Sequence, residues 1–270
     1  MLVTEKRMAG ADGAPIQLTV WEPDGPAKAV LQIVHGLGES AGRYKRWARQ
    51  LTGLDWAVYA HDLRGHGKSP GKRGGADYDT LLDDIRAVRT RIAAEQPDLP
   101  VSLYGHSLGG SLAIRRLLDH ARDYARAAVT GPWFAPRRDY PAQMLAAMRA
   151  LERAAPNFTL YLGQHGDAAG DAPHTRVGLR LFLQALESGI DAVDSAGDIQ
   201  TPLLVLCGEE DRAISHDAVT VFALTAFAAA RREGRDSFVT LRAYPRGEGR
   251  HGEGFEHILA FLEGAGGTDA

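Results

Sequence analysis

The chain is poor in cysteine, because Cys207 is the only one among its 270 residues. A single cysteine excludes an internal disulfide framework and a zinc site made of several cysteines. A chain without disulfides suits a reducing compartment, so the sequence predicts a cytoplasmic protein.

Long apolar segments and an excess of charge are also missing. The longest apolar stretch, residues 218–230, is too short to cross a bilayer and predicts a buried helix. Charged residues at positions 5–7 interrupt the N-terminus, which therefore lacks the apolar core of a signal peptide. With 31 Lys and Arg against 34 Asp and Glu, the net charge is −3, which argues against nucleic-acid binding through a broad basic field.

Short apolar runs alternate with amphipathic segments over most of the chain. Strand patterns cover residues 17–23, 29–34, 56–60, 101–104, 125–130, 202–207 and 237–244, and helical patterns cover residues 41–51, 78–96, 108–118, 215–232 and 255–263. The alternation predicts an α/β fold with a mostly parallel central sheet and helices on both faces.

Residues 131–197 break this alternation. They contain five prolines, helical patches at 142–155 and 176–189, and a linker rich in Gly, Asp and Ala. We interpret them as a helical lid inserted between a first core segment, 1–130, and a second, 198–270. An ordinary long crossover is the alternative. The apolar side chains of the insertion could line an acyl tunnel or pack the lid onto the core.

Residues 105–109, GHSLG, match the pattern G-x-S-x-G. An apolar strand pattern runs into the motif and a helical pattern leaves it, which is the setting that a nucleophilic serine requires. The sharp turn holds Ser107 in a strained conformation, and Gly105 and Gly109 let neighbouring backbone pass closely. The sequence therefore predicts Ser107 as the nucleophile.

A hydrolase that attacks a carbonyl must stabilise an oxyanion with preorganised donors. One donor is the backbone N–H of Leu108, directly after the nucleophile. The other lies in the loop after the strand pattern 29–34, where the sequence HGLG favours Leu37.

Serine also needs a base, and the base needs a carboxylate that orients it. The strand pattern 202–207 ends in GEEDR, where Asp211 is our choice for the acid and Glu210 the alternative. In the loop RGEGRHGEGF after the last strand, His251 is the candidate base, with His257 as the alternative.

The other histidines carry less signal. His106 is expected to point away from its neighbour in the chain, Ser107. His35, His61 and His66 fall in loop motifs and are expected to brace loops by hydrogen bonds. No pair of histidines has convincing metal-binding spacing, so no metal and no cofactor are predicted.

Four segments taken together, HGLGESAGRY, AHDLRGHGKSPGKRG, GHSLGG and LCGEEDR, resemble the monoacylglycerol lipase and lysophospholipase group of α/β-hydrolases. The resemblance covers residues 15–130 and 200–260. It implies the roles given above: a triad of Ser107, Asp211 and His251, and an oxyanion hole formed by Leu37 and Leu108.

The same resemblance implies that Glu39 and Arg43 lie near the glycerol head group of the substrate. The alternative is a local ion pair that braces the loop. Both interpretations stay open at the level of sequence.

The sequence thus predicts a serine hydrolase that cleaves carboxylic esters through an acyl-enzyme, with monoacylglycerols or related lipid esters as substrates. Alternatives on the same fold are a short-chain esterase, a lactonase or an amidase, and an alternative of another class is a non-catalytic binding protein. A lipid substrate makes transient membrane-surface contact through the lid conceivable. The 26 arginines against 5 lysines are typical of a GC-rich bacterial genome.

Overall fold

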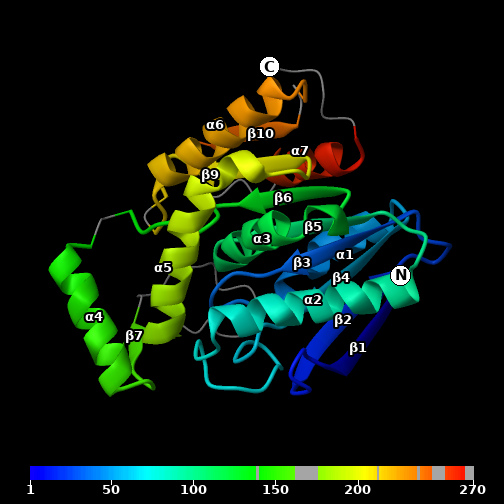
Figure 1. The fold of residues 1–270 in the computed structure, drawn as a ribbon. Coiled ribbons are helices and arrows are strands. Elements are labelled where there is room, and N and C mark those ends of the chain that lie inside the picture. The colour runs from blue at the N-terminus through cyan, green and yellow to red at the C-terminus, as the bar shows by residue number, and fades with distance from the viewer. Residues whose placement is uncertain (138–139, 162–175, 212, 236–237, 245–252, 265–270) are drawn as a thin grey trace. The chain divides into compact units, whose positions relative to one another are not determined.

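The computed structural model describes residues 1–137, 140–161, 176–211, 213–235, 238–244 and 253–264 (Figure 1). The chain divides into two compact units. The first contains Met1–Pro100 and Tyr140–Ala185, and the second contains Val101–Asp139 and Leu186–Ala270.

The sheet of the first unit has the strand order β1-β2-β4-β3. Its strands are β1 Leu2–Ala9, β2 Pro15–Glu22, β3 Ala29–Val34 and β4 Trp56–His61. The pairs β1–β2 and β2–β4 are antiparallel, and the pair β3–β4 is parallel. Strands β3 and β4 are buried along their whole length, as continuous apolar runs in a covered sheet should be.

Strand β1 was not predicted from the sequence patterns. Its centre is the charged run Glu5, Lys6 and Arg7, and its residues are at best half-buried. It forms a strand because it pairs with β2 over eight residues, from Leu2 opposite Glu22 onward. Charged side chains on such an edge discourage pairing with another chain.

Helices of the first unit include η1 Ala41–Tyr44, α1 Lys45–Thr52 and α2 Tyr78–Glu95. The helix predicted over residues 78–96 is confirmed as α2, in which Leu81, Ile85, Val88 and Ile92 are buried and Leu82 is half-buried. The Gln32 side-chain amide donates to the carbonyl of Ile85 at 3.0 Å, which fixes the helix against β3.

The second unit carries a fully parallel sheet in the order β5-β6-β9-β10. Its strands are β5 Val101–His106, β6 Arg126–Thr130, β9 Leu203–Gly208 and β10 Val239–Tyr244. Helix α3 Leu108–Asp119 packs on β5 and β6, α6 His216–Arg232 on β9 and β10, and α7 Glu253–Leu262 on β6 and β9. Every predicted strand and helix of this unit is thereby confirmed, with small shifts at the ends.

The segment predicted as an insertion, residues 131–197, contains α4 Ala142–Ala154, the antiparallel pair β7 Thr159–Tyr161 and β8 Arg176–Gly178, α5 Leu179–Asp194 and η3 Ala196–Asp198. The helical patch predicted at 176–189 is wrong at its start. Residues 176–178 pair antiparallel with β7 and therefore form a strand before α5 begins, and the Gly178 N–H also donates to the carbonyl of Gly74 at 2.6 Å. The role of this segment as a lid stays a prediction.

The apolar side chains of the segment differ in their surroundings. Phe134 is fully buried and its ring lies 4.8 Å from that of Phe222, so it packs a core. No residue of α4 is buried, and Met144 and Leu151 on it are exposed. Over the ranges that the structure describes, no helix combines the length and hydropathy needed to span a membrane.

Candidate active site

Ser107 sits in the sharp turn between β5 and α3, with φ 51° and ψ −117°. This conformation is sparsely populated for a residue with a side chain and persists only where its surroundings impose it. The Ser107 N–H donates to the carbonyl of Thr130 at 3.0 Å, and the Ser107 carbonyl accepts from the N–H groups of Ser111 and Trp133, both at 3.1 Å. Three backbone hydrogen bonds thus hold the strained turn, residues 105–111, which we call the Ser107 turn.

Two glycines allow α3 to approach the strand. A Cβ on Gly105 would lie 2.3 Å from the carbonyl oxygen of Gly109 and 2.8 Å from Cβ of Ala113. A Cβ on Gly110 would lie 3.0 Å from Cα of Pro132. The predicted close approach at Gly105 is confirmed, and Gly110 is a second such position that the sequence did not single out.

His106 turns to the neighbouring strand, as predicted. Its Nδ1 lies 2.9 Å from the Thr130 hydroxyl, which also lies 2.6 Å from the hydroxyl of Tyr104. These buried contacts tie the end of β5 to the end of β6.

Asp211 lies at the same edge of the parallel sheet as Ser107. In the register of the sheet, His106 pairs with Thr130, and Thr130 with Leu206, so β9 continues two residues beyond the level at which β5 ends, and Asp211 follows it. Two strand spacings separate β5 from β9 by roughly 10 Å.

The Asp211 side chain is anchored by backbone N–H groups and is less exposed than its acidic neighbours. Its Oδ1 accepts from the N–H groups of Ala213 at 2.7 Å and Ile214 at 3.2 Å, and the residue is half-buried. Glu209 and Glu210 are exposed. The second oxygen, Oδ2, accepts no hydrogen bond from the described residues. The fixed carboxylate favours Asp211 over Glu210 as the acid.

The predicted base, His251, lies outside the described residues. The alternative, His257, lies on α7 with its Nδ1 2.6 Å from the hydroxyl of Tyr244 and its side chain half-buried. His257 therefore has a structural partner of its own at the end of β10.

Leu37 lies in the loop that follows β3, residues 35–44, which we call the Leu37 loop. The carboxylate of Glu39 closes it: Oε2 accepts from the N–H of Gly36 at 3.0 Å and from the hydroxyl of Tyr44 at 3.2 Å. Arg43 Nε lies 3.3 Å from Oε1 of Glu39. The ion pair considered as an alternative for Glu39 and Arg43 is therefore present.

A buried carboxylate joins this loop to the next one. Asp62 accepts from the N–H of Ala41 through Oδ1 and from the N–H of Lys68 through Oδ2, both at 2.7 Å. A Cβ on Gly67 would lie 2.2 Å from Oδ2, so a glycine is needed there. The hydroxyl of Ser69 donates to the carbonyl of Asp62 at 2.6 Å. Asp62 is a functional candidate that the sequence patterns did not single out, although it lies in the segment HDLRGHGKS directly after a strand pattern.

The histidines near these loops divide into two kinds. His35 accepts the N–H of Leu63 at Nε2, 2.9 Å away, so its Nδ1 carries the proton and donates to the carbonyl of Gly36 at 2.8 Å. His66 Nδ1 lies 3.1 Å from the carbonyl of Arg64. For these two residues the predicted bracing is confirmed.

For His61 the predicted bracing is wrong. The side chain is fully buried, and neither ring nitrogen has a hydrogen-bond partner in the described part of the chain. Burial, reinforced by nearby His35 and opposed by Asp62, lowers the pKa of His61 to about 3. A neutral ring that fills space is all that this position requires.

Two backbone N–H groups are available as donors. Leu108 opens α3, where the first N–H groups of a helix lack intrahelical acceptors. Leu37 precedes Gly38, whose φ is 78°, in the turn closed by Glu39. Neither N–H donates to an acceptor within the described ranges.

The structure offers little to a metal ion. Among the described residues, no group of three or more His, Cys, Asp or Glu side chains could hold one. Cys207 is buried at the end of β9, with Sγ 3.5 Å from Nδ1 of His216. Burial, with Glu209 and Asp211 nearby, raises the pKa of the Cys207 thiol to about 11, so it stays protonated.

Comparison with known proteins agrees with this geometry. Curated relatives include the human monoglyceride lipase, 35% identical over 57% of this chain and 51% of the human protein, and the monoacylglycerol lipase of Mycolicibacterium smegmatis, 28% identical over 78% and 80%. The chain thus spans about half the length of the human relative. The resemblance to monoacylglycerol lipases is confirmed.

Solved structures extend the likeness to the whole fold. The Paleococcus ferrophilus monoacylglycerol lipase has a TM-score of 0.72 at 24% identity and covers 85% of this chain and 88% of its own. A soluble variant of the Saccharomyces cerevisiae monoglyceride lipase has a TM-score of 0.79 at 15% identity and covers 100% and 97%. At these identities the likeness shows the fold, and the predicted α/β-hydrolase class is confirmed.

A family model described as serine aminopeptidase, S33, matches residues 25–233. This match includes the Leu37 loop, the Ser107 turn and Asp211, and it covers well over half of the chain. The protein therefore belongs to the serine aminopeptidase S33 family of α/β-hydrolases.

Proposed function

We propose that this protein is a serine hydrolase that cleaves carboxylic esters, with Ser107 as nucleophile, His251 as base and Asp211 as the acid that orients it. The observation that carries the proposal is the strained backbone of Ser107. Strain at a residue with a side chain is retained where the residue has a task, and a serine at the start of a helix on a parallel sheet suits nucleophilic attack.

The proposed reaction begins when His251 takes the proton of the Ser107 hydroxyl and the oxygen attacks the ester carbonyl. The N–H groups of Leu37 and Leu108 hold the resulting oxyanion. Collapse breaks the ester bond, and the alkoxide leaves with the proton from His251. Water then attacks the acyl carbon and gives a proton to His251. The bond between the acyl carbon and the Ser107 oxygen breaks, the carboxylic acid leaves, and His251 returns the proton to the Ser107 oxygen. Asp211 stabilises the imidazolium in both halves.

Monoacylglycerols or related lipid esters are the proposed substrates. Relatives named as monoglyceride or monoacylglycerol lipases support this choice. The family description, serine aminopeptidase, favours amide hydrolysis as the second candidate. Both reactions use the same residues and differ in the leaving group.

We further propose that residues 131–197 form a cap on a core made of residues 1–130 and 198–270. The exposed apolar side chains of this segment, among them Met144, Leu151 and Phe158, suit contact with an acyl chain or transiently with a lipid surface. Glu39 and Arg43 act through the Leu37 loop, which their ion pair closes. A contact of either side chain with the glycerol head group stays a prediction.

The decisive experiment measures fatty-acid release from monoacylglycerols of graded chain length, p-nitrophenyl esters of the same acids, and amino-acid amides. The panel is run on the wild type, Ser107→Ala and His251→Ala, with fluorophosphonate labelling of each. We expect labelling and ester hydrolysis in the wild type and neither in Ser107→Ala. Cleavage of short activated esters without release from any monoacylglycerol would overturn the lipid substrate, and an unlabelled wild type would overturn the serine mechanism.

A further inference from the structure

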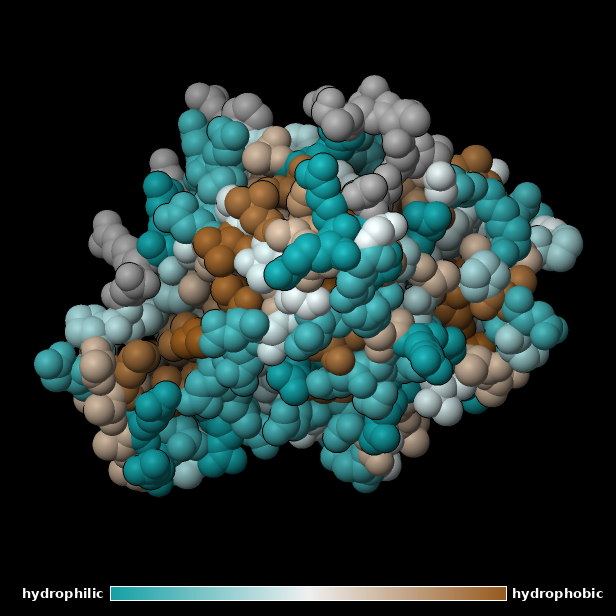
Figure 2. Space-filling model, turned by 45° about the horizontal axis from the view of Figure 1, so that its top comes forward, coloured by the Kyte–Doolittle hydropathy of each residue, from teal (hydrophilic) through white to brown (hydrophobic). Residues whose placement is uncertain are grey.

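Helix α6 is apolar on two faces, although the sequence predicted a helix that is simply buried. One face packs inside the second unit, with Val219, Phe222 and Ala226 buried. The opposite face exposes 51% of Val221, 57% of Leu224 and 36% of Phe227. A helix that is hydrophobic on opposite faces is normally enclosed on both, yet none of the described residues covers the outer face of α6. Figure 2 shows hydrophobic side chains at the surface on the side of the molecule that carries α6.

The outer face of α6 has an internal symmetry. Its residues Asp217, Val221, Leu224, Phe227 and Arg231 are all exposed, and the spacing on either side of Leu224 is the same, three residues and then four. At 100° per residue they fall within a stripe about 120° wide that is centred on Leu224. An acid begins the stripe and a base ends it. We call these five residues the α6 stripe.

We propose that the α6 stripe is a self-association surface, where α6 of a second copy of this chain packs antiparallel about a two-fold axis at Leu224. This arrangement sets Leu224 against Leu224 of the second copy, and Val221 level with Phe227 of the second copy. Asp217 then faces Arg231 of the second copy, and by symmetry this ion pair forms twice. The opposite order, parallel helices, would set like charges side by side.

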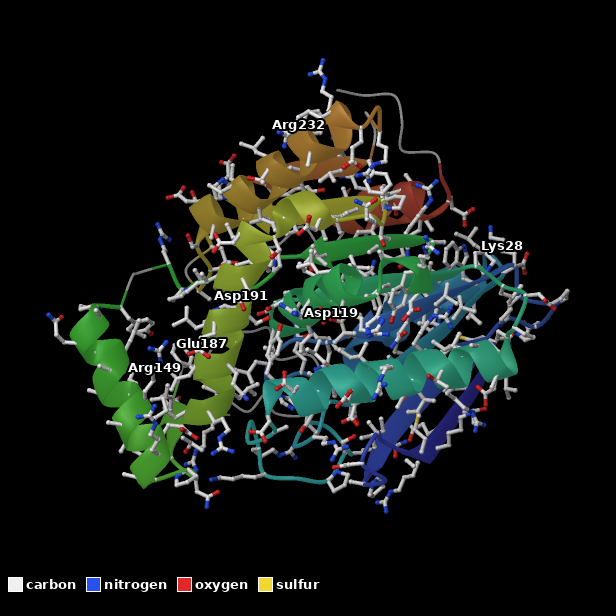
Figure 3. All side chains as sticks on the ribbon, in the orientation of Figure 1. Lys28, Asp119, Arg149, Glu187, Asp191 and Arg232 are labelled. Carbon is white, nitrogen blue, oxygen red and sulfur yellow. The ribbon has the colours of Figure 1, made fainter. Side chains whose placement is uncertain are left out.

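The charges favour a second copy of this chain over an unrelated partner. The α6 stripe carries an acid at one end and a base at the other, so it is complementary to its own antiparallel copy. Arg232, labelled in Figure 3 at the C-terminal end of α6, adds positive charge at the same end. One pair of 17-residue helices is small beside the roughly 1,200–2,000 Å² of a stable interface. The dimer is therefore concentration-dependent and dissociates on dilution.

Cysteine crosslinking tests the geometry directly. Thr225→Cys and Arg232→Cys both leave the α6 stripe intact, since each position follows a stripe residue by one and is exposed. Across the proposed axis, two copies of residue 225 lie about 3 Å apart along the helix, and two copies of residue 232 lie about 24 Å apart. The native Cys207 is buried with a thiol that stays protonated, so it does not compete.

We expect a short bis-maleimide to link Thr225→Cys into dimers and to leave Arg232→Cys monomeric. Equal crosslinking of both variants, or none of Thr225→Cys at the highest concentration, would overturn the proposal.

Charge reversal tests the pairing in solution, by sedimentation velocity over a concentration series. Asp217→Arg and Arg231→Asp should each weaken dimerisation several-fold, and the double variant should restore it, because the pattern is reversed but still complementary. Leu224→Glu places two like charges on the axis and should raise the dissociation constant at least about tenfold. Circular dichroism controls for folding. The proposed surface is contradicted if the wild type stays monomeric over the concentration series, or if Leu224→Glu leaves the dissociation constant of the dimer unchanged.

Discussion

The Ser107 turn and the Leu37 loop are held by different forces. Backbone hydrogen bonds and glycine packing hold the Ser107 turn, and no charged side chain takes part in the bonds to Ser107. The Leu37 loop depends on two carboxylates, Asp62 and Glu39, which accept backbone N–H groups. The turn should therefore tolerate changes of side-chain charge that the loop does not. The loop in turn should tolerate the loss of Ser107 without change.

The largest expected effect separates activity from stability at the Ser107 turn. Ser107→Ala and Ser107→Gly both remove the hydroxyl, so kcat should fall by about 10⁴-fold or more in each. Glycine adopts φ 51° without the cost borne by a side chain, which is of the order of 1–3 kcal/mol. Thermal unfolding should thus find Ser107→Gly at least as stable as Ser107→Ala. If alanine were the more stable, the turn would not be strained.

The sequence predicted the Ser107 turn better than the Leu37 loop because local patterns specify the turn. A strand, two glycines and a helix lie within residues 101–119, so their spacing alone indicates the geometry. The bonds of Asp62 join residues 21 and 6 positions away, and no periodicity reveals such partners. His61 shows the same limit in reverse: its motif suggested a loop residue held by hydrogen bonds, but it ends strand β4 and its ring has no hydrogen-bond partner among the described residues.

The two-faced helix α6 was mispredicted for a related reason. Residues 218–230 are apolar except for Thr220 and Thr225, so their pattern does not distinguish the face that the fold covers from the face that it exposes. Strand β1 was missed because its stability comes from β2 and not from its own charged residues. Composition and spacing report on local structure. The exposed face of α6 and the pairing of β1 depend instead on residues that are distant in the sequence.

The second prediction concerns the buried carboxylate of the Leu37 loop. In Asp62→Asn one oxygen becomes an amide NH2, which meets the N–H of either Ala41 or Lys68 and cannot accept from it. Losing a charged acceptor there should cost about 2–3 kcal/mol of unfolding free energy in urea titrations. Because the loop carries Leu37, kcat should fall while fluorophosphonate still labels Ser107. Asp79→Asn, at an exposed position on α2, is the matched control and should change neither quantity.

A third prediction follows from the low pKa of His61, about 3 in the folded chain against 6.5 for the free side chain. Between these values the unfolded chain binds a proton that the folded chain does not, so acid favours unfolding. His61 should thus remove about 1.4 kcal/mol of unfolding free energy per pH unit as the pH falls from 6.5 toward 3. In His61→Leu this contribution to the slope of unfolding free energy against pH should vanish. His120 is exposed, so His120→Leu should leave the slope unchanged. An unchanged slope in His61→Leu would show that acid acts elsewhere.

The smallest expected effect decides between two roles of Glu39. Glu39→Gln keeps an oxygen for the N–H of Gly36 but loses the ion pair with Arg43. If Glu39 only closes the Leu37 loop, kcat should fall a few-fold alike for monoacylglycerols and for p-nitrophenyl esters of the same acid, because both need the Leu37 N–H. If the carboxylate also binds the glycerol hydroxyls, KM should rise for monoacylglycerols alone. Arg43→Gln is the companion variant, since it breaks the same ion pair and leaves the carboxylate in place. A KM effect in Glu39→Gln that Arg43→Gln lacks would therefore assign the head-group contact to Glu39 itself.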